Sequence, residues 1–420
     1  MTQEILPQMG ARSAAPRAVL EHNEMQGPFH LPAGVEGLSL ALYQSCGVPL
    51  VPGHAVQLVE NGAIFDALVD AIRSARTSVH VLVYIWRPCA ASDRIIEALV
   101  ERARAGVACR IVVDPVGSED THGDKDFDQG PEQQLREAGC EVHYYRLLRN
   151  RLVGRMMGRI HQKIAVVDGQ VGITGGFGIW KVWEGAGLAV ENWRDTHVRV
   201  QGPAVRELQL AFSAAWQEAG GPLLPADVFP PTGDHGSVLA GFVASAGQLG
   251  LTRAERMYRV AIAAATKRLW IANAYFTPPD KMLEQLVTKA REGVDVRVLA
   301  PGPVHDVPTI LASQRSTYER LLEAGVRIWE YQPSMMHAKT MLADDWLSMV
   351  GSTNLDPLSL NKLSEGSLVI ADAAFTGQLA RSFEQDLTHS QEITLENGGR
   401  TSLWKRFARR ATQVLGKDRF

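Results

Sequence analysis

Apolar and polar residues follow the same order in two parts of the chain. In the first part, apolar residues at helical spacing over 65–72 lead into the apolar run 79–86. In the second part, the segment 257–265 leads in the same way into 269–276. Helical spacing followed by a short apolar run predicts a helix and then a buried strand in each part.

Two more pairs of segments extend this repeat. In each, a glycine stands between a helical pattern and a β-rich run, which indicates a helix end and a strand start. These glycines are Gly106 before 110–113, Gly293 before 297–299, and the matching pair Gly139 and Gly325. The alternation predicts an α/β fold of two domains related by a pseudo-twofold axis, each a mixed β-sheet flanked by helices, with one shared active-site cleft.

Composition changes along the chain suggest where these domains begin and end. Residues 1–53 are predicted to form a loose N-terminal arm, followed by a first domain over 54–219. The segment 220–236 contains four prolines and four glycines and is the expected linker. A second domain is predicted over 237–390, and a basic amphipathic C-terminal extension over 391–420.

The overall composition is that of an ordinary globular protein. Of the 420 residues, 45% are hydrophobic and 21% charged, and the length suits two domains. No apolar run approaches the roughly 18 residues of a membrane-spanning helix, and the N-terminus lacks a signal-peptide pattern, so we expect a cytoplasmic location. The four cysteines have no metal-binding spacing and are expected to be reduced. They are Cys46, Cys89, Cys109 and Cys140.

The chain carries one chemical motif twice, as H-x-K-x4-D. The copies are His161, Lys163 and Asp168, and His337, Lys339 and Asp344. A turn of small residues follows each copy: Gly175-Gly176-Phe177-Gly178 and Gly351-Ser352-Thr353-Asn354. We interpret the pattern as a duplicated phosphate site, in which Gly175, Gly176, Gly351 and Ser352 form phosphate-binding turns.

Two histidines supply what the cleavage of a phosphodiester needs. One neutral imidazole attacks phosphorus, and the other protonates the departing alkoxide. Lys163 and Lys339 share a strand face with their histidines and are predicted to hold the nonbridging oxygens, and Asn354 adds a donor. This chemistry requires no metal or other cofactor. We interpret Asp168 and Asp344 as structural anchors.

A carboxylate beside each imidazole would fix its tautomer and charge. Asp195 and Glu365 each lie downstream of one motif and precede an alternating apolar strand. We predict that they hydrogen-bond the catalytic imidazoles. The titrations of two neighbouring histidines would then belong to the pair.

These residues resemble the phospholipase D superfamily and, within it, the bacterial cardiolipin synthases. The resemblance covers about 53–394 and includes 161–168, 193–205 and 331–337, with 351–360 as its most specific stretch. It implies phosphatidyl transfer through a phosphohistidine, making cardiolipin and glycerol from two phosphatidylglycerols, with phosphatidylethanolamine as another candidate co-substrate. It further implies that His161 is the nucleophile and His337 the acid, an assignment that could be reversed. The chain looks like the shorter, peripheral members, which lack an N-terminal transmembrane hairpin.

The sequence departs from the family pattern at one turn. The first-half turn usually ends in Asn, and Gly178 stands there. An asparagine would restore a side-chain donor to the turn. We therefore predict that Gly178→Asn leaves activity equal or higher.

Two basic segments are candidates for contact with an anionic membrane on the inner face of the cell membrane. One contains Arg149, Arg151 and Arg155; the other contains Trp404, Arg406, Arg409 and Arg410 on an amphipathic helical pattern. The alternatives are a solvated loop for the first and docking on the protein's own core for the second. No obligate protein partner is evident.

Three functions compete at this stage. The first is the phosphatidyltransferase. The second is a hydrolase of phospholipid or nucleic-acid phosphodiesters, although a net charge of -3 does not favour nucleic acid as a partner. The third is a catalytically impaired lipid-binding protein, motivated by Gly178 alone.

Overall fold

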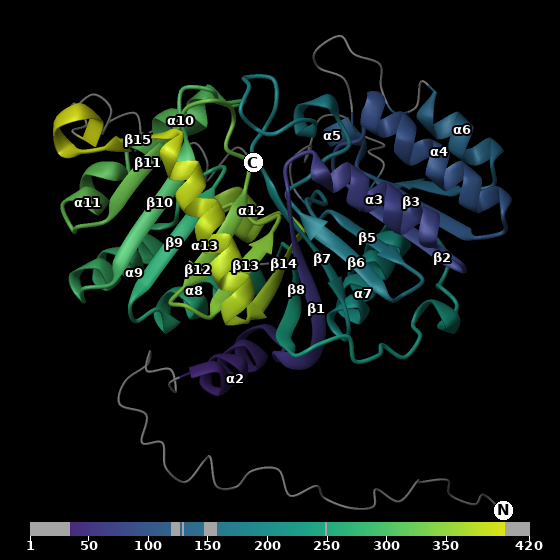
Figure 1. The fold of residues 1–420 in the computed structure, drawn as a ribbon, viewed down its shortest axis with the longest axis horizontal. Helices are drawn as coiled ribbons and strands as arrows, with labels where there is room; N and C mark the ends of the chain where they lie inside the picture. The colour runs from purple at the N-terminus through teal and green to yellow at the C-terminus, as the bar shows by residue number, and fades with distance from the viewer. Residues whose placement is uncertain (1–33, 119–126, 128–129, 147–157, 248–249, 400–420) are drawn as a thin grey trace, which may run out of the picture.

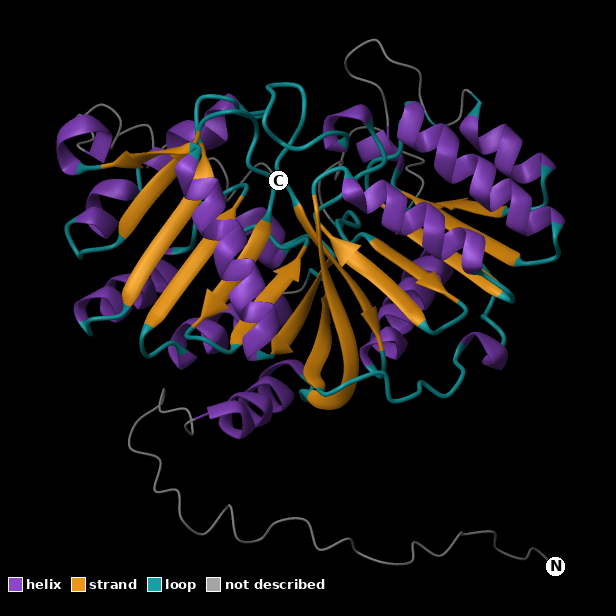
Figure 2. Ribbon diagram, viewed as in Figure 1, coloured by secondary structure: helices purple, strands orange, loops and turns teal. Residues whose placement is uncertain are grey.

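The computed structural model describes residues 34–118, 127, 130–146, 158–247 and 250–399. The described residues form one 15-stranded sheet, which fans out into two wings with helices on both faces (Figures 1 and 2). The first half of the chain builds one wing and the second half the other (Figure 1).

The same strand order occurs in both wings, which confirms the predicted duplication. From the centre outward, the first wing contains β1 (Val51–Glu60), β7 (Thr196–Gln201), β6 (Val171–Gly175), β5 (Ile164–Val167), β2 (Ser78–Val83), β3 (Ala108–Val113) and β4 (Glu141–Tyr144). The second contains β8 (Val238–Ser245), β14 (Glu365–Ala371), β13 (Leu347–Gly351), β12 (Lys339–Ala343), β9 (Arg268–Asn273), β10 (Asp295–Pro301) and β11 (Arg327–Tyr331), and β15 (Ser390–Ile393) extends its edge.

Each wing is a mixed sheet, as predicted. The pairs β2·β3 and β3·β4 are parallel, as are β9·β10 and β10·β11, and the other pairs are antiparallel. The wings are also joined, because β1 pairs with β8 before it pairs with β7. The pairing register shifts between Val51 and His54, where Gly53 has φ +101°. This left-handed conformation suits glycine and lets one strand serve both wings.

Helices cover the faces of both wings (Figure 2). In the first half they are α3 (Ala63–Ser74), α4 (Ala90–Arg104), α5 (Pro115–Ser118), α6 (Pro131–Glu137), η1 (Lys181–Trp183) and α7 (Ala204–Glu218). In the second they are α8 (Arg253–Ala264), α9 (Asp280–Arg291), α10 (Pro308–Arg315), α11 (Tyr318–Leu322), α12 (Pro357–Asn361) and α13 (Ala373–Thr388). The short turns η2 (Ala226–Val228) and η3 (Leu395–Gly399) lie after α7 and β15.

One apolar core crosses the junction between the halves. It contains Phe212 and Trp216 from α7 together with Phe242 from β8 and Phe383 from α13. Each half also has a core of its own. The shared core fixes the two wings against each other, which is what a site built from both halves requires.

Two predicted domain boundaries differ from the structure, because segments near both ends of the chain pack with the second half. Residues 34–46 form α2 (Gly34–Cys46), which packs on α8 and buries Leu38, Leu42 and Cys46. Apolar residues four apart place these side chains on one helix face, so this segment is part of the second half's core rather than a loose arm. β15 pairs with β11, so 390–393 belongs to the sheet rather than to an extension.

Candidate active site

The backbone of each half holds the motif histidine of the other half. Ile160 forms a parallel bridge with Ser364, and Met336 forms one with Arg194. The His161 N–H donates to the Ser364 carbonyl at 2.8 Å, and the His337 N–H donates to the Arg194 carbonyl at 2.7 Å. The first bridge therefore brings Glu365 beside His161, and the second brings Asp195 beside His337.

His161 is paired in this way with Glu365. Its Nδ1–H donates to Glu365 Oε1 at 2.9 Å, and the glutamate is completely buried. Ser352 donates its hydroxyl to Oε2 at 2.5 Å, and Ser359 donates to Oε1. The Tyr84 ring stands edge-on to the His161 ring, with centroids 5.5 Å apart. Two hydroxyls and one imidazole thus hydrogen-bond this carboxylate.

His337 is paired with Asp195. Its Nδ1–H donates to Asp195 Oδ2 at 2.7 Å, and the Trp183 indole N–H donates to the same oxygen at 2.8 Å. The Thr196 N–H donates to Oδ1 at 2.7 Å. The rings of Trp183 and Trp193 lie 5.3 and 4.8 Å from the His337 ring. The second carboxylate is therefore also buried and hydrogen-bonded, but its pocket is aromatic.

Because Nδ1 of each histidine is bonded to a carboxylate, Nε2 is the ring atom left for a substrate. Lys339 Nζ lies 2.9 Å from His337 Nε2, and both lysines donate to the carbonyl of their own histidine at 2.5 Å. Lys163 Nζ also lies 5.5 Å from the centre of the Tyr84 ring. The charge of Lys339 also acts on His161 and Lys163, so the two His-Lys pairs belong to one site, with a buried carboxylate behind each imidazole.

Burial and mutual repulsion among these cationic groups shift their titrations. Burial lowers the pKa of His161, and it lowers the pKa of His337 to about 4, with the Lys339 charge acting in the same direction. Burial lowers the pKa of Lys163 to about 7 and of Lys339 to about 8, against the opposing charges of the carboxylates. An anion entering between these groups would favour their charged forms. The site is therefore suited to a phosphodiester.

The Asp195 carboxylate is held ionised. Burial would raise its pKa, but the His337, His197 and Lys339 side chains outweigh burial and hold the pKa below its usual range. An ionised carboxylate at Nδ1 keeps the proton there and leaves Nε2 free to exchange a proton with a substrate.

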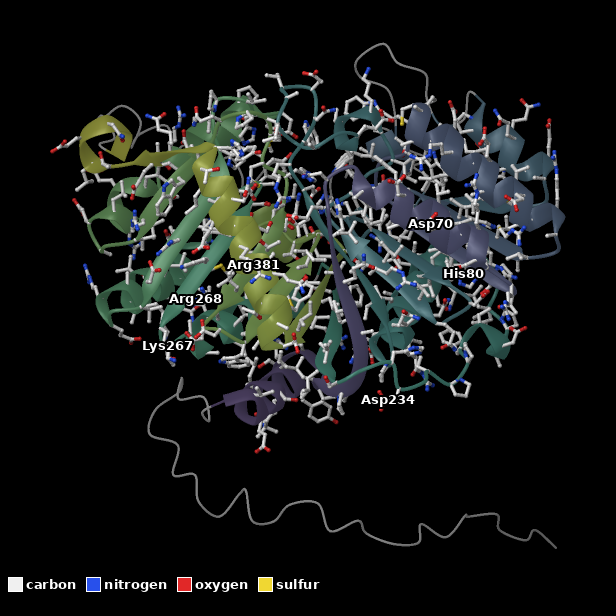
Figure 3. The ribbon with its side chains drawn as sticks, in the orientation of Figure 1. Asp70, His80, Asp234, Lys267, Arg268 and Arg381 are labelled. Carbon is white, nitrogen blue, oxygen red and sulfur yellow. The ribbon has the colours of Figure 1, made fainter. Side chains whose placement is uncertain are left out.

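The two motif aspartates lie away from this centre. Asp168 and Asp344 each have φ +52° at the far end of the strand that follows their histidine. Asp344 accepts the N–H groups of Thr266, Lys267 and Arg268 at 2.6 to 3.2 Å, and the latter two lie at the lower edge of the second half (Figure 3). Asp168 accepts those of residues 76–78. These contacts tie a strand end to a turn and place neither carboxylate at the histidines.

The space around Gly178 argues against the prediction that Gly178→Asn leaves activity equal or higher. A Cβ at Gly178 would lie 2.7 Å from Trp183 Cζ3 and 3.1 Å from Ile85 Cβ. The Trp183 ring occupies the space that an asparagine side chain would need. Because this ring also carries the N–H bonded to Asp195, a side chain at position 178 would disturb that carboxylate.

The turn residues contact the carboxylates in the structure. A Cβ at Gly176 would lie 2.4 Å from Asp195 Oδ1, so this glycine makes room for the aspartate. Ser352, its counterpart, donates to Glu365. Gly175 and Gly351 end β6 and β13 against β7 and β14, where a Cβ would clash. Their role in binding phosphate stays a prediction.

Asn354 lies in the same turn. Among the described residues, its buried Oδ1 has no hydrogen-bond partner, while its backbone N–H donates to Ser359 at 2.9 Å. A buried amide oxygen without a partner can accept a hydrogen bond from a substrate hydroxyl.

Some site residues were not singled out from the sequence, and others cannot be placed. Tyr84, Ser359 and Arg194 had no role in the prediction, although the last two stand in stretches that resemble the family. The candidate lipid-contact residues Arg149, Arg151, Arg155, Trp404, Arg406, Arg409 and Arg410 lie outside the described residues.

Among phosphodiester-processing proteins, crossed His-carboxylate pairs with two lysines on a duplicated α/β fold define the phospholipase D class. The chain belongs to the cardiolipin synthase family of this class. The family described as "Cardiolipin synthase, PLD-like domain" matches residues 68–214 and 258–387.

Curated relatives agree with this assignment. The chain is 33% identical over 373 residues to cardiolipin synthase A of Pseudomonas putida strain F1, covering 88% of this chain and 76% of the relative. It is 33% identical over 370 residues to cardiolipin synthase A of Pseudomonas aeruginosa PAO1, covering 87% and 73%.

Solved structures share the fold at low sequence identity. Phosphatidylserine synthase of Haemophilus influenzae Rd KW20 has a TM-score of 0.65 and 14% identity, covering 90% of this chain and 97% of that one. Polyphosphate kinase of Porphyromonas gingivalis has a TM-score of 0.53 and 12% identity, covering 96% and 58%. In the part of the chain that the structure describes, no helix has the length and apolarity needed to cross a bilayer.

Proposed function

We propose that this protein is a phosphatidyltransferase that makes cardiolipin from two phosphatidylglycerols and releases glycerol. The observation that carries the proposal is the pair of crossed contacts, His161 to Glu365 and His337 to Asp195, in a chain of the cardiolipin synthase family. Two oriented imidazoles on opposite sides of one site match a two-step transfer through a covalent intermediate.

In the first step, His161 Nε2 attacks the phosphorus of one phosphatidylglycerol. The bound diester anion favours the charged form of His337, so that, as the bond from phosphorus to the glycerol oxygen breaks, His337 Nε2–H gives that oxygen its proton. Lys163, Lys339 and Asn354 bind the nonbridging oxygens, where charge develops. Glu365 stabilises the positive charge that forms on His161, so that glycerol leaves and a phosphatidyl-histidine remains.

In the second step, a hydroxyl of the second phosphatidylglycerol attacks phosphorus. His337, now neutral, accepts the hydroxyl proton at Nε2, and the bond from phosphorus to His161 breaks. Both histidines return to their starting states, so no cofactor is consumed. Water in place of the hydroxyl would give phosphatidic acid.

Lipid mass spectrometry of purified protein with phosphatidylglycerol vesicles tests this proposal. Cardiolipin and glycerol should form, and His161→Ala and His337→Ala should abolish both. A surface substitution on α2, Tyr43→Phe, is a matched control and should leave the yield unchanged. Phosphatidic acid as the sole product would identify a hydrolase, and the absence of any product would reject the proposal.

We also propose that the protein works as a peripheral protein on the anionic inner face of the cell membrane. The support is the connection between β6 and β7, whose residues 185–190 contain no charged or polar side chain. Leu188 and Val190 in this loop are 53% and 64% exposed. The Gly187 carbonyl before them accepts hydrogen bonds from Tyr331 at 3.0 Å and Ser334 at 2.7 Å. Ser334 precedes His337 by three residues in the chain, so an apolar loop braced there would bring the site to the lipid surface.

Sedimentation with phosphatidylglycerol vesicles tests the membrane contact. The double substitution Leu188→Glu/Val190→Glu should reduce the bound fraction severalfold, because two charges would enter an apolar phase. The control, Leu40→Glu/Tyr43→Glu, changes two exposed residues of α2, which lies below the sheet in Figure 1. Equal sedimentation of both double variants and the wild type would contradict a contact through this loop.

A further inference from the structure

A second polar cluster lies beside His337. Its members are Tyr275, which follows β9, and His305 and Asp306, which follow β10. β9 and β12 are antiparallel, with Asn273 opposite Lys339. Tyr275 follows Asn273 by two residues, between two contacts with Leu355 in the Asn354 turn. The Leu355 N–H donates to Asn273 Oδ1 at 2.9 Å, and the Thr277 N–H donates to the Leu355 carbonyl at 3.0 Å, so this segment is held at the edge of the site.

Hydrogen bonds and stacking hold the cluster together. The Tyr275 hydroxyl donates to Asp306 Oδ2 at 2.5 Å. His305 Nδ1 lies 3.2 Å from Asp306 Oδ1 and accepts the Val307 N–H at 2.9 Å. The rings of Tyr275 and His305 stack with centroids 5.8 Å apart. The His305 side chain is 1% exposed, whereas that of Asp306 is 24% exposed, so the carboxylate is held at an accessible surface.

The cluster is also electrostatically coupled to the catalytic pair. The Asp306 carboxylate opposes the burial that lowers the pKa of His337 and of Lys339. Its own pKa is lowered: burial would raise it, but the neighbouring His305 and Tyr275 side chains outweigh that effect. An ionised carboxylate close to His337 is a strong acceptor for hydroxyl protons.

The matching place in the first half is arranged differently. Tyr84, which follows β2, lies edge-on to His161, and Asp114, which follows β3, accepts the Ile160 N–H at 3.3 Å. Asp114 is completely buried and lies 3.7 Å from Arg159, whereas the Asp306 side chain is 24% exposed. Of these two carboxylates, only Asp306 can therefore reach a substrate hydroxyl.

We propose that Tyr275 and Asp306 form the binding site for the polyol headgroup of the acceptor lipid, with His305 positioning Asp306. This inference rests on the proposed transferase function. The Asp306 carboxylate accepts a hydrogen bond from one headgroup hydroxyl, and the neighbouring hydroxyl points at phosphorus. That second hydroxyl gives its proton to His337 Nε2 as its oxygen bonds to phosphorus and the bond to His161 breaks.

This site gives the reaction a way to choose a lipid hydroxyl over water. Water has no second hydroxyl, so it gains nothing from Asp306 once its oxygen is at phosphorus. A polyol gains a charge-assisted hydrogen bond and loses less orientational freedom at the moment of attack. The phosphatidyl-histidine therefore partitions toward cardiolipin.

The product ratio measures this partition directly. Wild type, Asp306→Asn and Tyr275→Phe are incubated with phosphatidylglycerol vesicles, and cardiolipin and phosphatidic acid are quantified together. Both products come from the same intermediate, so their ratio does not depend on the rate at which it forms. We expect the ratio of cardiolipin to phosphatidic acid to fall about tenfold in Asp306→Asn and severalfold in Tyr275→Phe. Asp345→Asn, on an aspartate side chain that is 70% exposed in the turn between β12 and β13, is the matched control and should keep the wild-type ratio.

Exchange of labelled glycerol into phosphatidylglycerol provides a second measurement. The KM for free glycerol should rise about tenfold in Asp306→Asn, with a smaller change in the maximal rate. An unchanged product ratio together with an unchanged KM for glycerol would overturn the headgroup site. An equal loss of both products in both variants would overturn it as well, because that result indicates general damage. If wild type makes neither product, the proposed transferase function itself fails, and this outcome is distinct from the other two.

Discussion

The two histidines of the site have the same backbone setting but different carboxylate pockets. Glu365 receives the rotatable hydroxyls of Ser352 and Ser359, whereas Asp195 receives the fixed indole N–H of Trp183. Glycines at 176 and 178 leave room for the aspartate and for the indole ring. The comparison teaches that a duplicated site can keep its hydrogen-bond pattern while exchanging the residues that supply it. Gly178 is part of such an exchange and is no sign of a lost function.

The largest expected effect concerns the crossing of the pairs. Asp195→Asn and Glu365→Gln should each lower kcat by about two to four powers of ten, because each leaves an imidazole without its carboxylate. A phosphatidyl ester of p-nitrophenol has a leaving group that needs no proton, so the rate of p-nitrophenol release should distinguish the two variants. With this substrate, Asp195→Asn and His337→Ala should both regain activity. Glu365→Gln and His161→Ala should both stay impaired. Rescue of Glu365→Gln in place of Asp195→Asn would reverse the acid and nucleophile assignments.

Substitutions of the glycines in the first-half turn should have the next largest effect on kcat. Gly178→Asn should lower kcat by about a hundredfold, because the side chain displaces Trp183 from Asp195. Gly176→Ser should have a similar effect, since its Cβ meets the Asp195 carboxylate. The steady-state rate with phosphatidylglycerol gives both values, and Gly377→Ala on α13, where a Cβ meets only the end of Arg381 at 3.6 Å, is the control. Wild-type rates in Gly178→Asn would show that Trp183 is dispensable.

Removing single donors should have smaller effects and should sharpen the difference between the pockets. Trp183→Phe keeps the ring but removes the N–H, and should lower kcat about tenfold or more. Ser352→Ala should cost less, because Ser359 still donates to Glu365. Comparison of kcat for the two variants checks the order; a larger loss in Ser352→Ala would mean that the hydroxyls are not interchangeable.

The smallest effect is the dependence of the rate on pH. The lysines bind phosphate in their charged forms, and the pKa values of Lys163 and Lys339 are about 7 and 8. As pH rises through these values the lysines lose protons, so kcat/KM should already fall severalfold between about pH 6 and pH 7.5. Burial lowers the pKa of His161, so its neutral, nucleophilic form should persist to a lower pH than that of an ordinary imidazole. A pH profile of kcat/KM that rises from pH 7 to 9 would contradict this assignment.

Much of the fold follows from local patterns. The helix at 65–72 and the strand at 79–83 depend on residues close in sequence, and the repeat shows that the same unit occurs twice. The motif residues could also be named, because H-x-K places both side chains on one strand face. The bending of β1 between the wings and the docking of α2 could not be predicted, since each depends on a surface formed by distant residues.

The sequence by itself determined the set of residues that we propose to carry the chemistry: two histidines, two lysines and two carboxylates in a duplicated α/β chain. Only the tertiary structure decided which carboxylate serves which histidine, because the bridges from Ile160 to Ser364 and from Arg194 to Met336 join residues far apart in the chain. It also decided that Gly178 makes room for an indole ring. Both outcomes depend on close packing between segments that are distant in sequence. Whether a side chain fits in such a place depends on its volume and on neighbours that the local sequence does not specify.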